Sequence, residues 1–511
     1  MTMRPRSPLL PLAAAAALMP FGIHHAGAQT LTYGIYADAE DLDPHSARGS
    51  IADHPITIAL FDPLIWDYDL SKEHGERSGL RPMLASSWET IDDLTWELTL
   101  REGVTFHNGA PFNAEAVKYS IERPHHPDFE TGDKIIDVPI SHVEIIDDYT
   151  VRIVTHEPVP ILPQRLSRNG AFILEPGHYS DLSPQESSRM PVGTGPFKLV
   201  EWVRDQRIVM ERNEDYWGPM PNFDRLVYRV IPEPATMLAE VLTGGVDIAP
   251  VSPSNAEDVR AAEGVELIVG DSLVRAVLIV NVNIHEAFND PRVLQAMQWA
   301  IDTEALIDAF ALGEAEQAVT MVNPPNHNPN LEPYGYDPDR ARELLAEAGY
   351  PDGFTVELDV LHPDAFDWAE AAAFYLTEVG INISQVNMLS RPVWLPRNVE
   401  GTLNLHAHHW SAGENTPETD MWATHPDRPS NSTNWFNQEW YDLYAELVRT
   451  VDQERRTEIN FRMQEILHAE GGPWLTQFRV PLFRAISDRV AHYYPHPSFL
   501  VEDFAQIRLV E

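Results

Sequence analysis

Between residues 82 and 123 the pattern of apolar and polar positions changes from a strand-like to a helix-like period. Residues 95–100 alternate, so they are expected to form a strand whose apolar face holds Trp96, Leu98 and Leu100. Asn108-Gly109 then predicts a tight turn, because both residues tolerate a positive φ. Asn113 is expected to cap a helix whose buried side holds Ala114, Val117 and Ile121.

Shorter patterned runs lie on either side of this stretch. Residues 31–36 alternate and predict a first strand, and residues 143–145 and 149–154 predict a hairpin around Asp147-Asp148. Residues 234–242 predict a short helix that ends before Gly244-Gly245.

From about residue 276 the pattern becomes an alternation of strands and helices. Asp290-Pro291 and Asp337-Pro338 each combine an N-cap with a proline at the first helical position. Strands are predicted at residues 277–280, 354–361 and 381–386, and helices at 368–379, 438–451 and 453–469. This alternation predicts an α/β lobe with a mostly parallel sheet.

The charge balance excludes several classes of partner. The chain has 511 residues and is 43% hydrophobic, which is typical of a globular protein. Its 78 acidic residues outnumber 36 basic ones, and the net charge of −42 repels nucleic acid and anionic lipid headgroups. The acidic residues are spread along the chain and only four of the basic residues are lysines, so adaptation to high salt and simple lineage composition are both open.

The first 28 residues have the features of a secretory signal. Arg4 and Arg6 precede an apolar run from Leu9 to Leu18, and Ala26-Gly27-Ala28 predicts cleavage before Gln29. No later segment has about 18 consecutive apolar residues. The chain has no cysteine, so we expect no disulfide and no lipid-anchored cysteine. These features predict an exported periplasmic protein that is not inserted in a membrane.

Several motifs in residues 82–123 resemble the signature of the family 5 extracellular solute-binding proteins. This is the oligopeptide, dipeptide and nickel-binding group that delivers ligands to ABC importers. The matching motifs are LASSWE at 84–89, DDLTW at 92–96, LREGVTFHNGAPF at 100–112 and AEAVKYS at 114–120. Further similar segments are LDP at 42–44, GTGPF at 193–197, ERNEDYWG at 211–218 and VDI at 246–248. In the GTGPFK segment, Pro196 lacks the backbone donor that a nucleotide-binding loop would need.

The resemblance implies an α/β, two-lobed periplasmic-binding-protein fold with mixed or mostly parallel sheets flanked by helices. Lobe I would comprise residues 29–52, 184–274 and 481–511, with an extra subdomain at 53–183, and lobe II would comprise 275–480. The implied partners are a small-molecule or peptide ligand and the transmembrane subunits of an ABC permease. The protein is expected to act as a monomer.

No catalytic motif emerges from the sequence. HExxH, GxSxG and CxxC are all absent, so the protein is not expected to be an enzyme or to need a cofactor. His406, His408 and His409 form the one metal candidate, to which His362 and His425 could add ligands. No spacing completes a three- or four-ligand site, so no metal residue is assigned.

Residues 391–436 combine aromatic residues with a few charges, as a small-molecule cleft requires. Arginine suits a ligand carboxylate, and an acidic side chain suits a ligand ammonium. The predicted ligand-binding residues are Arg391, Trp394, Arg397, Trp410, Glu414, Asp420 and Trp435, with Glu418, Trp422 and Phe436 nearby. Peptide-binding relatives have a DYPDP-like segment after the tryptophan that matches Trp410, with an aspartate for the peptide amino terminus. Here the aspartate is out of register, and Glu414, Glu418 or Asp420 would have to replace it.

The leading hypothesis is therefore a periplasmic receptor that closes around a small solute, with a peptide as the first choice. A chelated metal of the nickel type and a sugar or opine-like solute are the alternatives. A secreted hydrolase is the alternative from another class.

Overall fold

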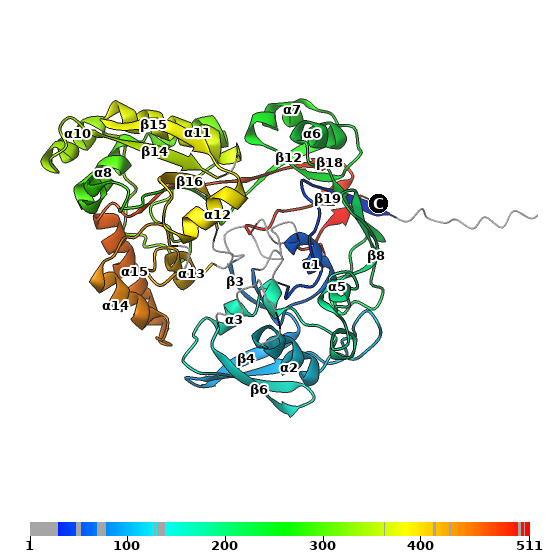
Figure 1. Ribbon diagram of the computed structural model, residues 1–511. Coiled ribbons are helices and arrows are strands. Elements are labelled where there is room, and N and C mark those ends of the chain that lie inside the picture. Colours follow the sequence, from blue (N-terminus) through cyan, green and yellow to red (C-terminus); the bar gives the residue numbers. More distant parts are fainter. Residues whose placement is uncertain are drawn as a thin grey trace, which may run out of the picture.

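The computed structural model describes residues 29–46, 53–68, 78–126, 129, 138–361, 363–411, 415–428, 431–498, 502–504 and 506–510. The strands in this part of the chain form sheets of seven, five and four strands and two small two-stranded sheets. In Figure 1 the five-stranded sheet lies at the upper left, the seven-stranded sheet at the right and the four-stranded sheet at the bottom. The predicted signal segment, residues 1–28, lies outside the described residues.

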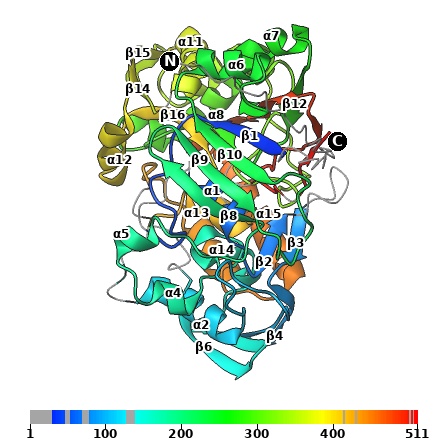
Figure 2. The same cartoon turned by 90° about the vertical axis from the view of Figure 1, so that its right-hand side faces the viewer.

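The seven-stranded sheet takes strands from both ends and from the middle of the chain, and Figure 2 shows it face-on. Its order is β12 (Val265–Gly270), β18 (Leu482–Ser487), β11 (Ile248–Pro250), β1 (Thr30–Ile35), β10 (Arg225–Val230), β9 (Arg207–Arg212) and β8 (Phe197–Val203). β1 is parallel to β10 and β11, and the other pairings are antiparallel. The predicted first strand and the helix predicted at 234–242 are confirmed, as β1 and α6 (Pro234–Leu242).

The four-stranded sheet is an antiparallel unit that contains the motif-rich stretch. Its order is β4 (Ala85–Asp92), β5 (Thr95–Leu100), β7 (Thr150–Thr155) and β6 (Ile140–Asp147), so the predicted strand and hairpin are confirmed. α2 (Ala114–Glu122) packs on this sheet, and its N-cap Asn113 accepts a hydrogen bond from the Ala116 amide at 3.3 Å. Ala114, Val117 and Ile121 are buried, as predicted.

Shorter elements complete this half of the molecule. The strands are β2 (Ile65–Tyr68), β3 (Ser78–Pro82), β19 (Val490–His492) and β20 (Arg508–Leu509). The helices are α1 (His54–Leu60), α3 (Leu162–Arg165), α4 (Pro176–Tyr179), α5 (Pro184–Ser187) and α7 (Ala256–Ala261), with 3₁₀ turns η1 (Arg123–His125), η3 (Asn169–Ala171) and η4 (Pro253–Asn255).

The five-stranded sheet contains both parallel and antiparallel pairs, whereas the sequence pattern after residue 276 predicted a mostly parallel sheet. Its order is β15 (Ile381–Met388), β14 (Phe354–Val360), β16 (Leu405–Trp410), β13 (Arg275–Ile279) and β17 (Trp474–Arg479). β14 is parallel to β15 and β16, as the strand–helix–strand alternation requires. β13 is antiparallel to both of its neighbours, because β13 and β17 lie outside that alternation and carry the chain into and out of this half.

Eight helices accompany this sheet in the described chain, and three of them escaped prediction. They are α8 (Pro291–Ala300), α9 (Thr303–Ala311), α10 (Pro338–Glu347), α11 (Pro363–Glu378), α12 (Arg391–Val399), α13 (Pro417–Trp422), α14 (Gln438–Leu447) and α15 (Gln453–Ala469), with a 3₁₀ turn η5 (Glu286–Asn289). The Asp-Pro starts of α8 and α10 are confirmed, since both aspartates accept capping hydrogen bonds. α11 begins at Pro363, earlier than the expected residue 368. The helices that were not foreseen are α9, α12 and α13. In α12 and α13 the prolines and polar residues obscure the helical period.

Two crossovers join the halves. Residues 271–274 connect β12 to β13, and residues 480–481 connect β17 to β18. They run side by side, because the Val480 amide donates to the Val274 carbonyl at 2.8 Å. Each half has its own large hydrophobic cluster, so each packs around a core of its own. The predicted boundaries at 275 and 480 fall at these crossovers, and the division into lobes and subdomain stays a prediction.

The motifs of the first half meet around one buried carboxylate, Asp62. Thr194 of the GTGPF segment donates to Asp62 at 2.8 Å, and Trp217 and Tyr216 of the DYWG segment donate at 2.9 and 3.3 Å. Burial raises the pKa of Asp62 to about 6, although these hydrogen bonds oppose the rise. The junction holds together segments that are far apart in sequence.

His107 of the FHNG turn joins the same junction. Its Nε2 donates to the Gly195 carbonyl at 3.0 Å, and its amide donates to the Gly193 carbonyl at 2.9 Å. A Cβ at Gly193 would lie 2.1 Å from the Leu60 carbonyl oxygen at the end of α1. The glycines of GTGPF therefore permit close contact between backbones.

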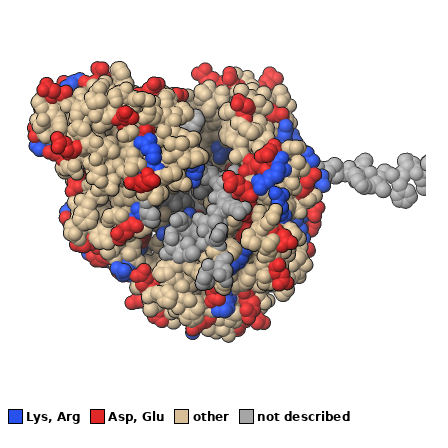
Figure 3. All heavy atoms as spheres, in the orientation of Figure 1, with Lys and Arg blue, Asp and Glu red and all other residues tan. Residues whose placement is uncertain are grey.

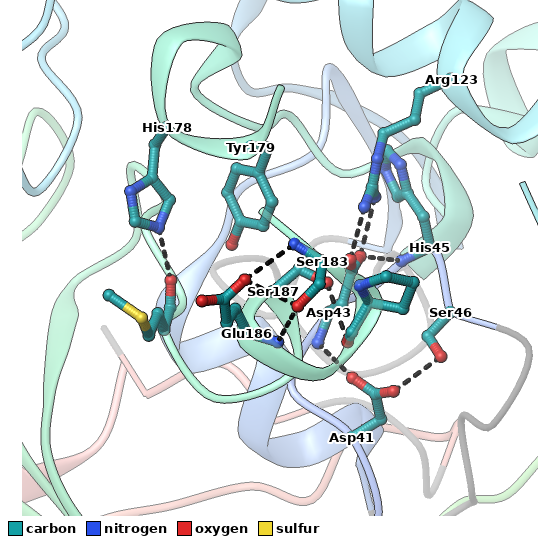
Figure 4. Close-up of polar contacts among 12 residues, drawn as sticks. Asp41, Asp43, His45, Ser46, Arg123, His178, Tyr179, Ser183, Glu186 and Ser187 are labelled. Atoms are coloured by element: carbon teal, nitrogen blue, oxygen red, sulfur yellow. Dashed lines mark hydrogen bonds and ion pairs between the residues drawn. The ribbon is translucent and has the colours of Figure 1, made fainter. Parts of the chain in front are cut away.

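The LDP segment forms a second contact, drawn in Figure 4. Arg123, at the end of α2, donates to both oxygens of Asp43 at 2.9 and 2.6 Å, and the His45 amide donates at 3.0 Å. Burial opposes ionisation of Asp43, but the bonds from Arg123 outweigh it and lower the pKa. The pair fixes the segment after β1 against the four-stranded unit.

Candidate functional site

The candidate binding site is the space between the two halves. Figure 3 shows a hollow at the centre of the face that it draws. In Figure 1, α12 and α13 border this place from the five-stranded half, and α1 and α3 border it from the other. The predicted ligand segment, residues 391–436, supplies α12, β16 and α13. Acidic side chains are spread over the surface around the hollow.

At the start of β13, Arg275 forms a buried ion pair with Asp420 of α13. Arg275 Nη2 donates to Asp420 Oδ1 at 2.6 Å, and both side chains are 1% exposed. Asp420 Oδ2 also accepts from the Asn323 amide at 3.2 Å. The guanidinium lies 4.7 Å from the centre of the Trp410 ring, and Trp410 is partly exposed. Asp420 thus fixes Arg275 against the ring of Trp410. Of these three side chains, only that of Trp410 is partly exposed and so within reach of a ligand.

The predicted residues of α12 divide between packing and exposure. Trp394 is buried against His406 and His408 of β16, with ring centres 6.3 and 5.4 Å away. Arg397 pairs with the buried carboxylate of Asp359 at 2.9 Å. Arg391, at the first turn of α12, is exposed. Only Arg391 of these three is open to a ligand without rearrangement.

The remaining predicted residues also divide into buried and exposed side chains. Trp435 is 7% exposed and donates to Glu470 at 3.0 Å. Glu418 is buried and pairs with Arg456. Trp422 is partly buried, while Phe436 is 58% exposed. Glu414 lies outside the described residues. None of these placements identifies a ligand contact, so the assignment stays a prediction.

The histidines on β16 do not converge on one point. His406 is buried between the Asn404 carbonyl and the Ser432 hydroxyl, both at 3.0 Å, and burial lowers its pKa to about 4. His409 accepts a hydrogen bond from the Trp368 indole at 3.1 Å. Within the described residues no group of three His, Cys, Asp or Glu side chains could hold a metal ion. His425 stacks among aromatic rings, and His362 is outside the described residues.

The sequence interpretation missed Arg428 and Tyr444. Arg428 follows α13 and is partly buried, and no carboxylate of the described residues forms an ion pair or hydrogen bond with it. Tyr444 on α14 is 8% exposed and donates to the Glu418 carbonyl at 3.3 Å. In the sequence Arg428 directly follows Asp427, so nothing there shows that the two side chains do not pair.

Comparison with solved structures shows which class of protein has this fold. A binding protein DppA from Helicobacter pylori, solved with the peptide STSA, superposes with a TM-score of 0.78 at 24% identity, covering 94% of this chain and 98% of that one. NikA from Brucella suis, solved with Fe(III)-EDTA, superposes with a TM-score of 0.82 at 24% identity, covering 94% and 100%. The chain therefore has the two-lobed fold of the periplasmic binding proteins, as predicted.

The family follows from the sequence comparison. The family described as bacterial extracellular solute-binding proteins, family 5, matches residues 79–432, and the chain belongs to it. The glutathione-binding protein GsiB of Escherichia coli K12 is 28% identical over 522 aligned residues, which cover 98% of each chain. The predicted family and its solute-binding role are confirmed. No helix within the described ranges has the length and apolarity needed to cross a membrane.

Proposed function

We propose that the protein captures a peptide-like solute between its two halves and delivers it to an ABC permease. The observation that carries this proposal is the pair of separately packed α/β cores joined by adjacent crossovers at residues 271–274 and 480–481. A solute that contacts both halves stabilises the closed form, because binding shifts the population toward the state with more contacts.

Peptide is the first choice of ligand for two reasons. GsiB binds glutathione and the DppA structure holds a peptide, and both resemble this chain along nearly its whole length. The partly exposed Trp410 also offers an apolar contact of the kind that a side chain of a peptide requires.

A chelated metal is the second candidate. NikA, solved with Fe(III)-EDTA, superposes on this chain, and the chelate rather than protein side chains could supply the metal ligands. This agrees with the engagement of His406 and His409 in hydrogen bonds within the protein. Sugar and opine-like solutes remain further alternatives.

Residues 1–28 are proposed to direct export and then to be removed, which would leave a periplasmic monomer without a lipid anchor. The mass of the protein released by osmotic shock tests this step, and we expect a chain that begins near Gln29. A mass that retains residues 1–28 would contradict it.

The ligand is best identified by native mass spectrometry of the protein as purified, followed by calorimetry with the solute found. We expect binding of a peptide without turnover. Product formation after incubation with peptides would favour the hydrolase alternative, and stoichiometric metal would favour the chelate.

A further inference from the structure

Two arginine–glutamate pairs of the described residues join one half of the molecule to the other. Arg449, just after α14, donates from Nη2 to Oε2 of Glu157, just after β7, at 3.1 Å. Arg260 of α7 donates from Nη2 to Oε1 of Glu314, which follows α9, at 3.4 Å. The two pairs have the same chemistry and a similar exposure, but they lie in different places relative to the crossovers.

The Arg260–Glu314 pair lies beside the crossovers. The amide of Arg479, the last residue of β17, donates to the Glu316 carbonyl at 3.0 Å, so this segment runs next to the second crossover. Leu312, in the same segment, packs against a hydrophobic cluster of the seven-stranded half. A contact beside the axis of a hinge changes little when the hinge turns.

The Arg449–Glu157 pair lies at the opposite end of the molecule. Figure 1 shows α14 at the lower left and the four-stranded sheet at the bottom, whereas β12 and β18, which the crossovers join to the other half, are at the top. A rotation that opens the halves about the crossovers therefore moves Arg449 and Glu157 apart. Their contact forms only when the halves are close together.

Each member of this pair is held in place by its own half. Arg456 donates to two carbonyls of the turn that carries Arg449, at 3.0 and 3.2 Å. The Thr155 hydroxyl donates to the Glu157 carbonyl at 2.7 Å, at the end of β7. Because both backbones are already fixed, little further ordering is needed when the pair forms.

The pair acts against a general repulsion between the halves. Acidic residues outnumber basic ones in each half, so the two halves carry charge of the same sign. The side chains of Arg449 and Glu157 are 57% and 50% exposed, and a pair of this exposure changes an equilibrium about two- to fivefold. Inside one half this would be a small effect, but across two halves that open and close it changes the ratio of closed to open molecules directly.

We propose that Arg449 and Glu157 form an electrostatic latch that holds part of the population closed before a solute binds. The inference rests on the proposed function, because it assumes the same closure about the crossovers. It goes beyond that function by giving the closed form a contact that is independent of the solute. A population that is partly closed in advance binds its solute more tightly than one that the solute alone must close.

The test measures the distance between the halves without any solute. The chain has no cysteine, so D93C and E454C place one spin label on each half, at two exposed positions. The turn at Asp93 lies near Glu157, because the Leu94 carbonyl accepts from the Thr155 amide at 2.9 Å. Double electron–electron resonance then gives the ratio of short to long distances.

The doubly labelled parent is compared with three variants. R449Q breaks the latch, and E157R/R449E rebuilds it with its charges exchanged. R260Q breaks the pair beside the crossovers and is the matched control, since its side chain is 48% exposed.

At about 0.05 M NaCl the parent should populate the short distance, and R449Q should lower the ratio of closed to open molecules about two- to fivefold. E157R/R449E should restore the ratio, and R260Q should leave it unchanged. In about 1 M NaCl, where the Debye length is about 3 Å, the difference between the parent and R449Q should disappear. The melting temperature of R449Q should match that of the parent, because both side chains of the pair are well exposed.

The outcomes separate the latch from the proposed function. A distance distribution that R449Q does not change would overturn the latch, as would a difference that persists in high salt or a clear fall in the melting temperature of R449Q. If glutathione or tri-alanine shortens the distance while R449Q without solute behaves as the parent, the latch is wrong and the peptide function stands. If R449Q opens the molecule but neither peptide changes the distances, the latch stands and the peptide function is wrong.

Discussion

The Arg275–Asp420 pair offers the sharpest test of how the site is built, through the substitution Asp420→Asn. Both side chains are 1% exposed, and burial already lowers the pKa of Arg275 against the stabilising charge of Asp420. Removal of one partner from a buried ion pair costs about 3–5 kcal/mol, because the remaining charge is left buried without compensation. At about 2–4 °C per kcal/mol for a unit of about 200 residues, the melting temperature should fall by about 6–20 °C.

The assay is thermal unfolding followed by circular dichroism, with Asp339→Asn as the control. Asp339 pairs with Arg342 on the surface of α10 and is 90% exposed, so its loss should have little effect. The double variant R275M/D420L should recover most of the stability, since apolar side chains of similar volume replace the buried charges. A fall for Asp420→Asn no larger than that for Asp339→Asn would refute the reasoning and leave Asp420 available as a ligand anchor.

Three further predictions follow from the packing and the charge. Gly193→Ala would place a Cβ 2.1 Å from the Leu60 carbonyl oxygen, so it should destabilise by about 1–3 kcal/mol in urea unfolding, whereas Gly335→Ala, with its nearest atom at 3.4 Å, should be close to neutral. Burial lowers the pKa of His107 to about 4 from 6.5, so stability from this group is present above pH 6.5 and is lost as the pH falls towards 4. His107→Gln should flatten that part of the pH profile, and an unchanged profile would contradict the assignment. The net charge of −42 predicts that the melting temperature rises with salt. Between about 0.05 and about 2 M NaCl the Debye length falls about sixfold, and a melting temperature that stays the same over this range would favour lineage composition as the cause of the charge.

The local elements of the fold were predictable because their signals are short-range. Asn113 caps α2 and the Asp-Pro pairs start α8 and α10, since capping depends on side chains within three residues. The hairpin around Asp147-Asp148 follows from alternation alone. Strand direction in the five-stranded sheet could not be read in this way, because the pairing of β13 with β17 joins segments about 200 residues apart.

The candidate site was less predictable for the same reason. Three residues look like ligand contacts in the sequence, namely Trp394, Arg397 and Asp420. Each of them instead packs on or pairs with a residue of another element, which the sequence does not place beside it. Residue type indicates what a side chain can bind, but only the packing decides whether a ligand can reach it.

The central claim is that solute binding closes two units about the crossovers at residues 271–274 and 480–481. The direct measurement is small-angle X-ray scattering of the purified protein with and without the solute identified in the cleft. We predict a smaller radius of gyration at saturating solute than without solute. A radius of gyration that stays the same with every solute shown to bind would contradict the claim.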